Sequence, residues 1–315
     1  MPTATDPRPV VILGAAGFIG RALTTQLATN GFKVRAVTRT TAAFAPSVEV
    51  RVAGMLDHRS DWRGLFDGAR AVVHLASRAH APPGDAAWLA AECHTAAAIA
   101  SAATAIGVER TILLSSIKVL GEATTDRPFS ATSEPDPRDA YGRAKLAMER
   151  AMQGHGAPGL TIIRPPLVYG PDVKGNFRAL LRWIKRRVPL PLAMIRNRRA
   201  FVFRDNLSAL IATALIHPAA VGQIFLVRDD EEIGTPQLVR EIARRIDAPA
   251  RLFSMPPWLL RAATGDRLVS SLSVDDGATR ARLRWRPPFS LADGLDATCR
   301  WFIDVEGAQA RGSRL

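Results

Sequence analysis

The sequence of 315 residues contains two cysteines and six histidines, and neither set forms a site. Cys93 and Cys299 match no disulfide framework and no metal-ligand spacing. The histidines show no metal-binding pattern either. We therefore expect a protein without a metal site, whose cysteines stay reduced in the cytoplasm.

Long hydrophobic runs are also absent. No stretch of about 18 or more apolar residues occurs, and no charged-then-apolar leader precedes Val10. The sequence therefore predicts no spanning helix and no stable insertion into a membrane. This agrees with the cytoplasmic location that cysteine usage suggests.

Negative charge is scarce beside positive charge. Lys and Arg number 42 against 29 Asp and Glu, which gives a net charge of +13. Aromatic residues make up 6% of the chain, and no basic stretch interleaves with them as a nucleic-acid stacking platform requires. We therefore expect no nucleic-acid partner. The densest basic run, 178–187, predicts an amphipathic helix whose basic face meets solvent or, as the less favoured alternative, an anionic membrane surface.

Glycines are concentrated where the first predicted strand meets the first predicted helix. Val10–Leu13 is an apolar run that predicts a buried strand, and 18–28 predicts a helix with one apolar face. Glycines at such a turn let the backbone approach a pyrophosphate, and the helix N-terminus offers free N–H groups to it. The residues expected to hold a dinucleotide here are Gly14, Gly17, Phe18, Ile19 and Gly20.

The residue after the second predicted strand, 33–37, normally selects between NAD and NADP. A carboxylate there accepts from the ribose 2′-hydroxyl of NAD. This chain has Thr38-Arg39-Thr40 instead, and the Arg39 guanidinium is suited to a 2′-phosphate. The alternative is a solvated surface arginine. The sequence therefore favours NADP(H), with NAD(H) as the alternative cofactor.

Tyr141 and Lys145 lie one helical turn apart on the same predicted helix face. A free phenol has a pKa of about 10, and a nearby ammonium group favours the phenolate. Ser116, which follows the predicted strand 111–114, would hydrogen-bond the reacting oxygen. We predict that Ser116, Tyr141 and Lys145 are catalytic, and that Tyr141 and Lys145 also contact the cofactor. The alternative is chance spacing on an amphipathic helix.

Apolar strands alternate with helical stretches as far as about residue 165. This pattern predicts an α/β fold with a Rossmann-type doubly wound parallel sheet. Beyond Gly170 prolines become dense, which predicts a smaller C-terminal α/β substrate-binding lobe. We expect a dinucleotide-binding domain over 1–168 and, over 169–306, mainly the lobe, with some segments returning to the sheet. A flexible tail is expected over 307–315.

The glycine turn and the Tyr-x-x-x-Lys pair together resemble the extended branch of the short-chain dehydrogenase/reductase superfamily. The segments 72–77 and 164–171 resemble that branch where its members pass the cofactor and the substrate. The resemblance implies that Leu75, Ala76 and Pro165 contact the cofactor. It also implies that Asp57 stands in for an acid near the adenine, because Met55 replaces the usual Asp.

Longer segments resemble the NAD(P)-dependent nucleotide-sugar epimerase/dehydratase family. They are Ser-Ser-Ile-Lys-Val-Leu-Gly-Glu over 115–122, Gly-Pro-Asp-Val-Lys-Gly-Asn-Phe over 170–177, Pro-Leu-Pro over 189–191 and Leu-Arg-Trp-Arg-Pro-Pro over 283–288. The nearest group is that of bacterial UDP-N-acetylquinovosamine 4-dehydrogenases and UDP-glucose 4-epimerase-like proteins, and the resemblance covers 9–302. It implies substrate contacts from Ser115, Lys118, Asn176, Arg199 and Arg267.

Ile117 and Lys118 argue against a dehydratase. Related 4,6-dehydratases carry an Asp-Glu pair at these positions, because loss of water from C5 and C6 needs an acid and a base. Ile117 cannot move a proton, and Lys118 has the wrong charge for that step.

The leading hypothesis is a reductase that acts on the C4 keto group of a UDP-4-keto-6-deoxy-N-acetylhexosamine for surface polysaccharide synthesis such as O-antigen. It would run as a 4-dehydrogenase in reverse with NADPH, as Arg39 suggests. The alternative is a UDP-sugar 4-epimerase that keeps NAD bound. A third hypothesis is a non-catalytic dinucleotide-binding sensor or assembly protein, which the intact Ser116, Tyr141 and Lys145 disfavour. The resemblance also allows a homodimer through two long helices.

Overall fold

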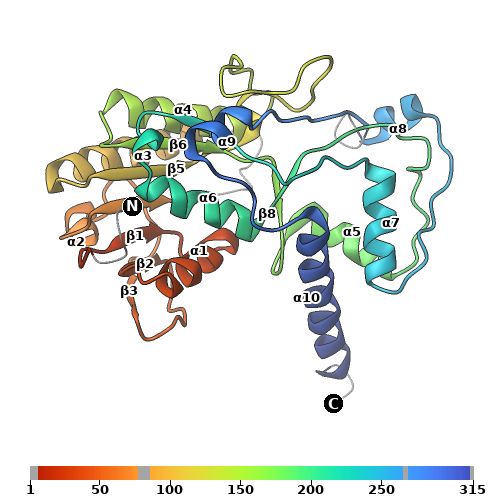
Figure 1. Ribbon diagram of the computed structural model, residues 1–315, viewed down its shortest axis with the longest axis horizontal. Coiled ribbons are helices and arrows are strands. Elements are labelled where there is room, and N and C mark those ends of the chain that lie inside the picture. The colour runs from red at the N-terminus through yellow and green to blue at the C-terminus, as the bar shows by residue number, and fades with distance from the viewer. Residues whose placement is uncertain (1–5, 77–85, 265–268, 313–315) are drawn as a thin grey trace.

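Seven parallel strands form one sheet in the computed structural model, which describes residues 6–76, 86–264 and 269–312 (Figure 1). The strand order is β3-β2-β1-β4-β5-β6-β9. The bounds are β1 Val10–Leu13, β2 Val34–Thr38, β3 Val48–Val52, β4 Ala71–His74, β5 Arg110–Leu114, β6 Leu160–Arg164 and β9 Ile224–Leu226. Strand β1 pairs with β2 on one side and β4 on the other, so the winding reverses there. This confirms the predicted Rossmann-type sheet, whose ligand crevice lies at that switch point.

Helices cover both faces of the sheet. On one face lie α1 (Phe18–Thr29) and α6 (Arg204–Ile216), which pack on each other. On the other lie α2 (Trp62–Phe66), α3 (Ala86–Ile106) and α4 (Ala140–Gly154). The central strands are buried on both sides, which explains why they read as continuous apolar runs rather than as alternating ones.

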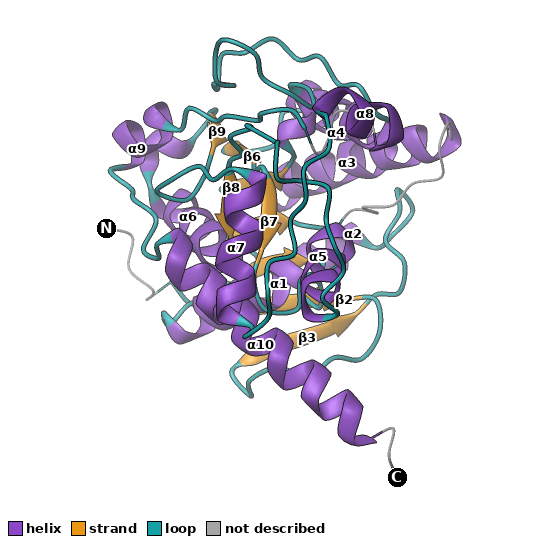
Figure 2. Cartoon of the chain, turned by 90° about the vertical axis from the view of Figure 1, so that its right-hand side faces the viewer, coloured by secondary structure: helices purple, strands orange, loops and turns teal. Residues whose placement is uncertain are grey.

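A second apolar core builds the lobe seen at the right of Figure 1 and nearest the viewer in Figure 2. It surrounds the two-stranded parallel pair β7 and β8, with Tyr169 and Phe177 stacked at its centre. The bounds are β7 Leu167–Tyr169, β8 Phe201–Phe203, α5 Gly175–Lys185, α7 Thr235–Arg245, α8 Pro257–Thr264 and α10 Leu291–Gly312. Helix α9 (Gly277–Leu283) instead packs on the sheet domain, where it contacts β9. Two short 3-10 helices are η1 (Ile117–Val119) and η2 (Pro218–Ala220).

The chain after Gly170 does not stay in the lobe. Helix α6 returns to cover the sheet beside α1, and β9 pairs with β6 as an edge strand. Helix α10 extends away from the body and runs to Gly312, into the segment 307–315 for which a tail was expected (Figure 2).

Helix α3 is long and apolar enough to cross a membrane by length and composition alone. It packs along α4, and its residues Ile99, Ala100 and Ala103 are buried in the core of the sheet domain. Much of its hydropathy comes from alanine, which suits close packing against a neighbouring helix.

Candidate active site

The glycine turn joins β1 to α1 at the switch point of the sheet, and its glycines have no side chains to cover the backbone there. Gly14 has φ +86°, and a Cβ there would lie 3.0 Å from the Ala76 nitrogen. A Cβ on Gly20 would lie 2.2 Å from the Gly14 carbonyl oxygen. Gly17 is the N-cap of α1, and no side chain caps the N–H groups of the first turn there. Such a bare turn at a helix N-terminus fits a dinucleotide pyrophosphate.

The neighbours of this turn include several of the predicted cofactor residues. The Leu75 nitrogen donates to the Leu13 carbonyl at 3.0 Å, so the end of β4 runs beside the turn. Phe18 and Ile19 are half-buried at the start of α1, and the Phe18 ring lies 5.6 Å from the Arg204 guanidinium carbon. These positions place Leu75, Ala76 and the first turn of α1 around one crevice.

Arg39 and Asp57 are both exposed, near the same edge of the sheet. Arg39 directly follows β2, at the carboxyl end where a cofactor ribose is expected. The Asp57 carboxylate accepts from the Arg59 nitrogen at 2.8 Å, within a local turn. Asp57 therefore has an internal partner, and its adenine contact stays a prediction.

Helix α4 and η1 bring Tyr141 and Lys145 to the segment that carries Ser116. Ser116 is half-buried and is the N-cap of η1. The Lys145 ammonium donates to the Leu114 carbonyl at 2.9 Å and lies 5.8 Å from the centre of the Tyr141 ring. A Cβ on Gly142 would lie 2.5 Å from the Lys118 carbonyl oxygen, so only glycine lets α4 approach η1 this closely.

Burial dominates the acid–base properties of the Tyr141–Lys145 pair. It raises the pKa of the Tyr141 phenol to about 12, with smaller contributions from the charges of Asp139 and Glu92. It lowers the pKa of the Lys145 ammonium to about 8, against the opposing charges of Glu92 and Glu149. The sequence predicted that Lys145 would lower the pKa of the Tyr141 phenol. In the protein alone the pKa of this phenol is raised instead. At neutral pH Tyr141 keeps its proton and Lys145 is mostly charged.

Lys118 joins the loop after β5 to the start of α4. Its ammonium pairs with the Asp139 carboxylate and lies 3.4 Å from a Glu122 carboxylate oxygen. Asp139 is the N-cap of α4 and accepts from the Gly142 nitrogen at 2.7 Å. Sequence reasoning missed Asp139, although an Asp just before a predicted helix is an N-cap signal. Lys118 thus has protein partners here, and its substrate contact stays a prediction.

Behind Lys145 lies a buried ionic network that the sequence did not reveal. Glu149, one turn further along α4, accepts from Arg164 at 2.9 and 2.6 Å. The Ser115 hydroxyl also donates to Glu149. All three side chains are buried, so Ser115 has an internal partner, and its substrate contact stays a prediction. Pairing between α4 and β6 carries no local sequence signal, because it depends on how the two elements pack.

The remaining predicted site residues are spread over the end of β6 and the lobe. Pro165 is buried, and its carbonyl accepts from the Ile117 nitrogen at 2.9 Å, beside Ser116. Asn176 is exposed in the first turn of α5. Arg199 is half-buried and donates to the Ser270 carbonyl at 3.1 Å, and burial lowers the pKa of its guanidinium. Arg267 lies outside the described residues.

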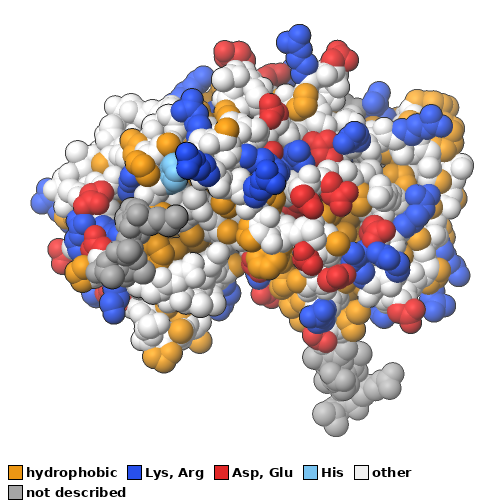
Figure 3. Space-filling model, in the orientation of Figure 1, with side chains coloured by type: hydrophobic (Ala, Val, Ile, Leu, Met, Phe, Trp, Pro, Cys, Tyr) orange, Lys and Arg blue, Asp and Glu red, His pale blue; other side chains and the backbone are white. Residues whose placement is uncertain are grey.

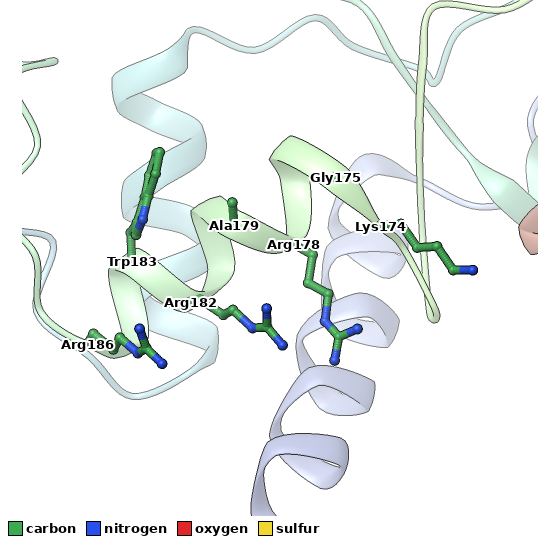
Figure 4. Close-up of a pocket in the computed structure, with 7 residues that line it drawn as sticks. All are labelled: Lys174, Gly175, Arg178, Ala179, Arg182, Trp183 and Arg186. Atoms are coloured by element: carbon green, nitrogen blue, oxygen red, sulfur yellow. The ribbon is translucent and has the colours of Figure 1, made fainter. Parts of the chain in front are cut away.

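A basic hollow of about 510 Å³ runs along α5, and none of the predicted catalytic residues lines it. Figure 4 shows Arg178, Arg182 and Arg186 on one side of the helix and Trp183 pointing away from them. Arg178 lies over the Trp301 ring of α10, and Arg182 pairs with Glu306 at 3.2 Å.

Among the described residues, no group of His, Cys, Asp and Glu side chains could hold a metal ion.

Comparison with known proteins gives consistent matches over most of the chain. The family described as "NAD dependent epimerase/dehydratase family" matches residues 10–227. UDP-glucose 4-epimerase of Vibrio cholerae is 34% identical over 318 residues, covering 95% of this chain and 97% of that one. Ceramide reductase of Caulobacter vibrioides is 30% identical over 324 residues, covering 95% and 96%. The crystal structure of UDP-glucuronic acid 4-epimerase from Bacillus cereus in complex with NAD has the same fold. Its TM-score is 0.79 at 18% identity, covering 94% of this chain and 99% of that chain.

Proposed function

This chain belongs to the NAD dependent epimerase/dehydratase family, and we propose that it is a UDP-sugar 4-epimerase. The observation that carries this proposal is the similarity to UDP-glucose 4-epimerase along nearly the whole chain. The contact of η1, which follows Ser116, with α4, which carries Tyr141 and Lys145, supports it. This similarity makes epimerisation the first choice over the reduction that the sequence favoured.

Tyr141, Ser116 and Lys145 have different roles at the C4 oxygen of the sugar. The Tyr141 phenol exchanges a proton with that oxygen, and the Ser116 hydroxyl orients it. The positive charge of Lys145, 5.8 Å from the ring centre, favours the phenolate when the phenol has to act as a base. Bound at the glycine turn, NAD would supply reversible hydride acceptance from C4. For oxidation of the C4 hydroxyl Tyr141 must first be a phenolate, so that it takes the hydroxyl proton, and it gives the same proton back when the C4 carbonyl is reduced.

A second candidate, reduction of a 4-keto-sugar with NADPH, is favoured by Arg39. The exposed guanidinium follows β2 at the place where a 2′-phosphate is expected, and no acid competes for the ribose. A relative at 30% identity is named a ceramide reductase, so net reduction is known on a similar chain.

The deciding experiment follows sugar and cofactor together. Purified protein is incubated with UDP-glucose or UDP-N-acetylglucosamine and NAD, and products are identified by proton NMR. Conversion to the C4 epimer without net change in NADH absorbance supports the epimerase. Net NADPH consumption with a UDP-4-keto-sugar, and no interconversion of the 4-hydroxy sugars, would replace it with the reductase. Tyr141→Phe must abolish whichever activity is seen.

We further propose a cytoplasmic homodimer. The support is the pairing of the two long helices α3 and α4, which resembles the helix pair through which the extended branch dimerises. Light scattering after size exclusion tests this, and a monomer at micromolar concentration would contradict it.

A further inference from the structure

Two stretches of the lobe sequence contain basic residues and no acidic ones. Between Val173 and Arg204 the sequence contains ten Lys or Arg residues and no Asp or Glu. A second segment, 248–264, adds Arg251 and Arg261, again without an acid. These two segments supply nearly all of the net charge of +13. Three of the counted arginines, Arg182, Arg198 and Arg204, pair with acidic residues outside these stretches, so the surface charge comes from the remaining ones.

Large apolar side chains are exposed on the same two segments. Trp258 is 71% exposed, the highest value among the large hydrophobic residues described, while the next-but-one residue, Leu260, is buried and anchors α8. The exposed apolar residues of this region are Trp183, Val188, Met194, Phe253, Trp258 and Leu259. Scattered exposed hydrophobic residues are ordinary, but a cluster of aromatic and aliphatic side chains indicates an interaction surface.

Backbone hydrogen bonds hold the two segments side by side. The Leu190 nitrogen donates to the Arg251 carbonyl at 2.8 Å, and the Phe253 nitrogen donates to the Leu190 carbonyl at 3.0 Å. The Ala193 nitrogen donates to the Phe253 carbonyl at 3.2 Å, which brings Met194 beside Phe253. Helix α8 begins four residues further on, so the apolar and basic residues form one surface.

Figure 3 shows hydrophobic and basic side chains together at the right-hand end of the molecule, where α8 lies in Figure 1. We call this end the apolar–basic surface. It consists of the six apolar residues above with Lys185, Arg187, Arg196 and Arg251, all of them exposed.

We propose that the apolar–basic surface docks the protein reversibly onto an anionic lipid bilayer. Tryptophan, phenylalanine and leucine side chains insert at the level of the headgroups, and lysine and arginine attract anionic headgroups around them. The absence of acidic residues in both segments provides the charge complementarity that such a bilayer needs. Docking here requires no spanning helix and no bound sugar substrate, so it does not depend on the proposed function.

The test uses the full-length protein and sedimentation with two kinds of vesicle, phosphatidylcholine alone and phosphatidylcholine mixed with phosphatidylglycerol. We expect binding to the anionic vesicles that is at least about tenfold stronger than to the neutral ones and that weakens with salt. Equal binding to both vesicles, or none to the anionic ones, would overturn the proposal.

Substitutions separate the two contributions. The apolar variant Phe253→Ser, Trp258→Ser, Leu259→Ser and the basic variant Lys185→Gln, Arg187→Gln, Arg251→Gln should each weaken vesicle binding about tenfold or more. The control variant Val52→Ser, Arg150→Gln changes one exposed apolar and one exposed basic residue elsewhere and should bind like the wild type. Circular dichroism must show that all three variants are folded, and sugar turnover without vesicles should be unchanged.

Two further readouts address insertion and self-association. Vesicles with brominated acyl chains should quench tryptophan fluorescence, and Trp258→Phe should remove much of this quenching while binding persists. If the apolar variant instead turns a dimer into a monomer and the wild type ignores anionic vesicles, the surface is a contact between two copies and the proposal is wrong.

Discussion

The Lys118 ammonium pairs with the Asp139 carboxylate, and this contact joins the segment carrying Ser116 to the first turn of the helix carrying Tyr141. The same Asp139 caps that helix by accepting from the Gly142 nitrogen. An ion pair that contains neither residue is therefore one of the contacts that hold the segment carrying Ser116 against the helix carrying Tyr141.

Replacing Lys118 should disturb this alignment. We expect Lys118→Met to lower kcat about tenfold or more with little change in the KM for the sugar nucleotide, because small displacements of reacting groups are costly. Lys118→Arg should retain most of the activity. Steady-state kinetics distinguish the roles, since a raised KM with unchanged kcat would mean that Lys118 contacts the substrate diphosphate instead.

The two tyrosines should respond differently to loss of the hydroxyl. Tyr141→Phe removes the group that moves the proton and should lower kcat about 100-fold or more, with stability nearly unchanged. Tyr169 is buried and donates to Asp229 at 2.8 Å, so Tyr169→Phe should lower stability by about 1–3 kcal/mol. Turnover and urea denaturation of both variants check this. Full activity of Tyr141→Phe would rule out its catalytic role.

Stability should depend on pH through Lys145. Its pKa is about 8 in the folded protein against 10.5 ordinarily, so the unfolded chain binds the extra proton between these values. The free energy of unfolding should therefore rise with pH across this window, by on the order of 3 kcal/mol in full. Lys145→Met removes the contribution. Urea denaturation of both proteins from about pH 7 to about pH 10.5 measures the difference, and a constant difference would mean an ordinary pKa.

Cofactor choice should depend on Arg39. If the guanidinium binds a 2′-phosphate, Arg39→Ser should raise the KM for NADP(H) about tenfold and leave that for NAD(H) unchanged. Arg63→Ser, at another exposed arginine on α2, is the matched control. A wild-type preference for NAD that Arg39→Ser does not alter would show that Arg39 is a solvated surface residue.

The buried Glu149–Arg164 pair should matter for folding more than for binding. Glu149→Ala leaves the Arg164 charge buried without its carboxylate and should cost about 3–5 kcal/mol of stability. The double variant Glu149→Leu, Arg164→Met should lose much less, because it removes both charges and keeps the volume. Chemical denaturation of the two variants makes the comparison. Equal losses would mean that side-chain packing, and not the buried charge, sets the cost.

Local sequence patterns correctly predicted several elements in the first half of the chain. The strand Val10–Leu13 is where the apolar run predicted it, and the helix expected over 18–28 spans Phe18–Thr29. Tyr141 and Lys145 lie one turn apart on one helix, as their spacing requires. These features depend on periodicity and on glycine at a turn, which are properties of neighbouring residues.

Tertiary structure alone decided the partners of the polar side chains. It paired Lys118 with Asp139 and gathered Ser115 and Arg164 around Glu149, across distances in the chain that no local pattern encodes. It also decided the acid–base state of Tyr141 and Lys145, because desolvation depends on what covers a group and is the largest influence on the pKa of both side chains.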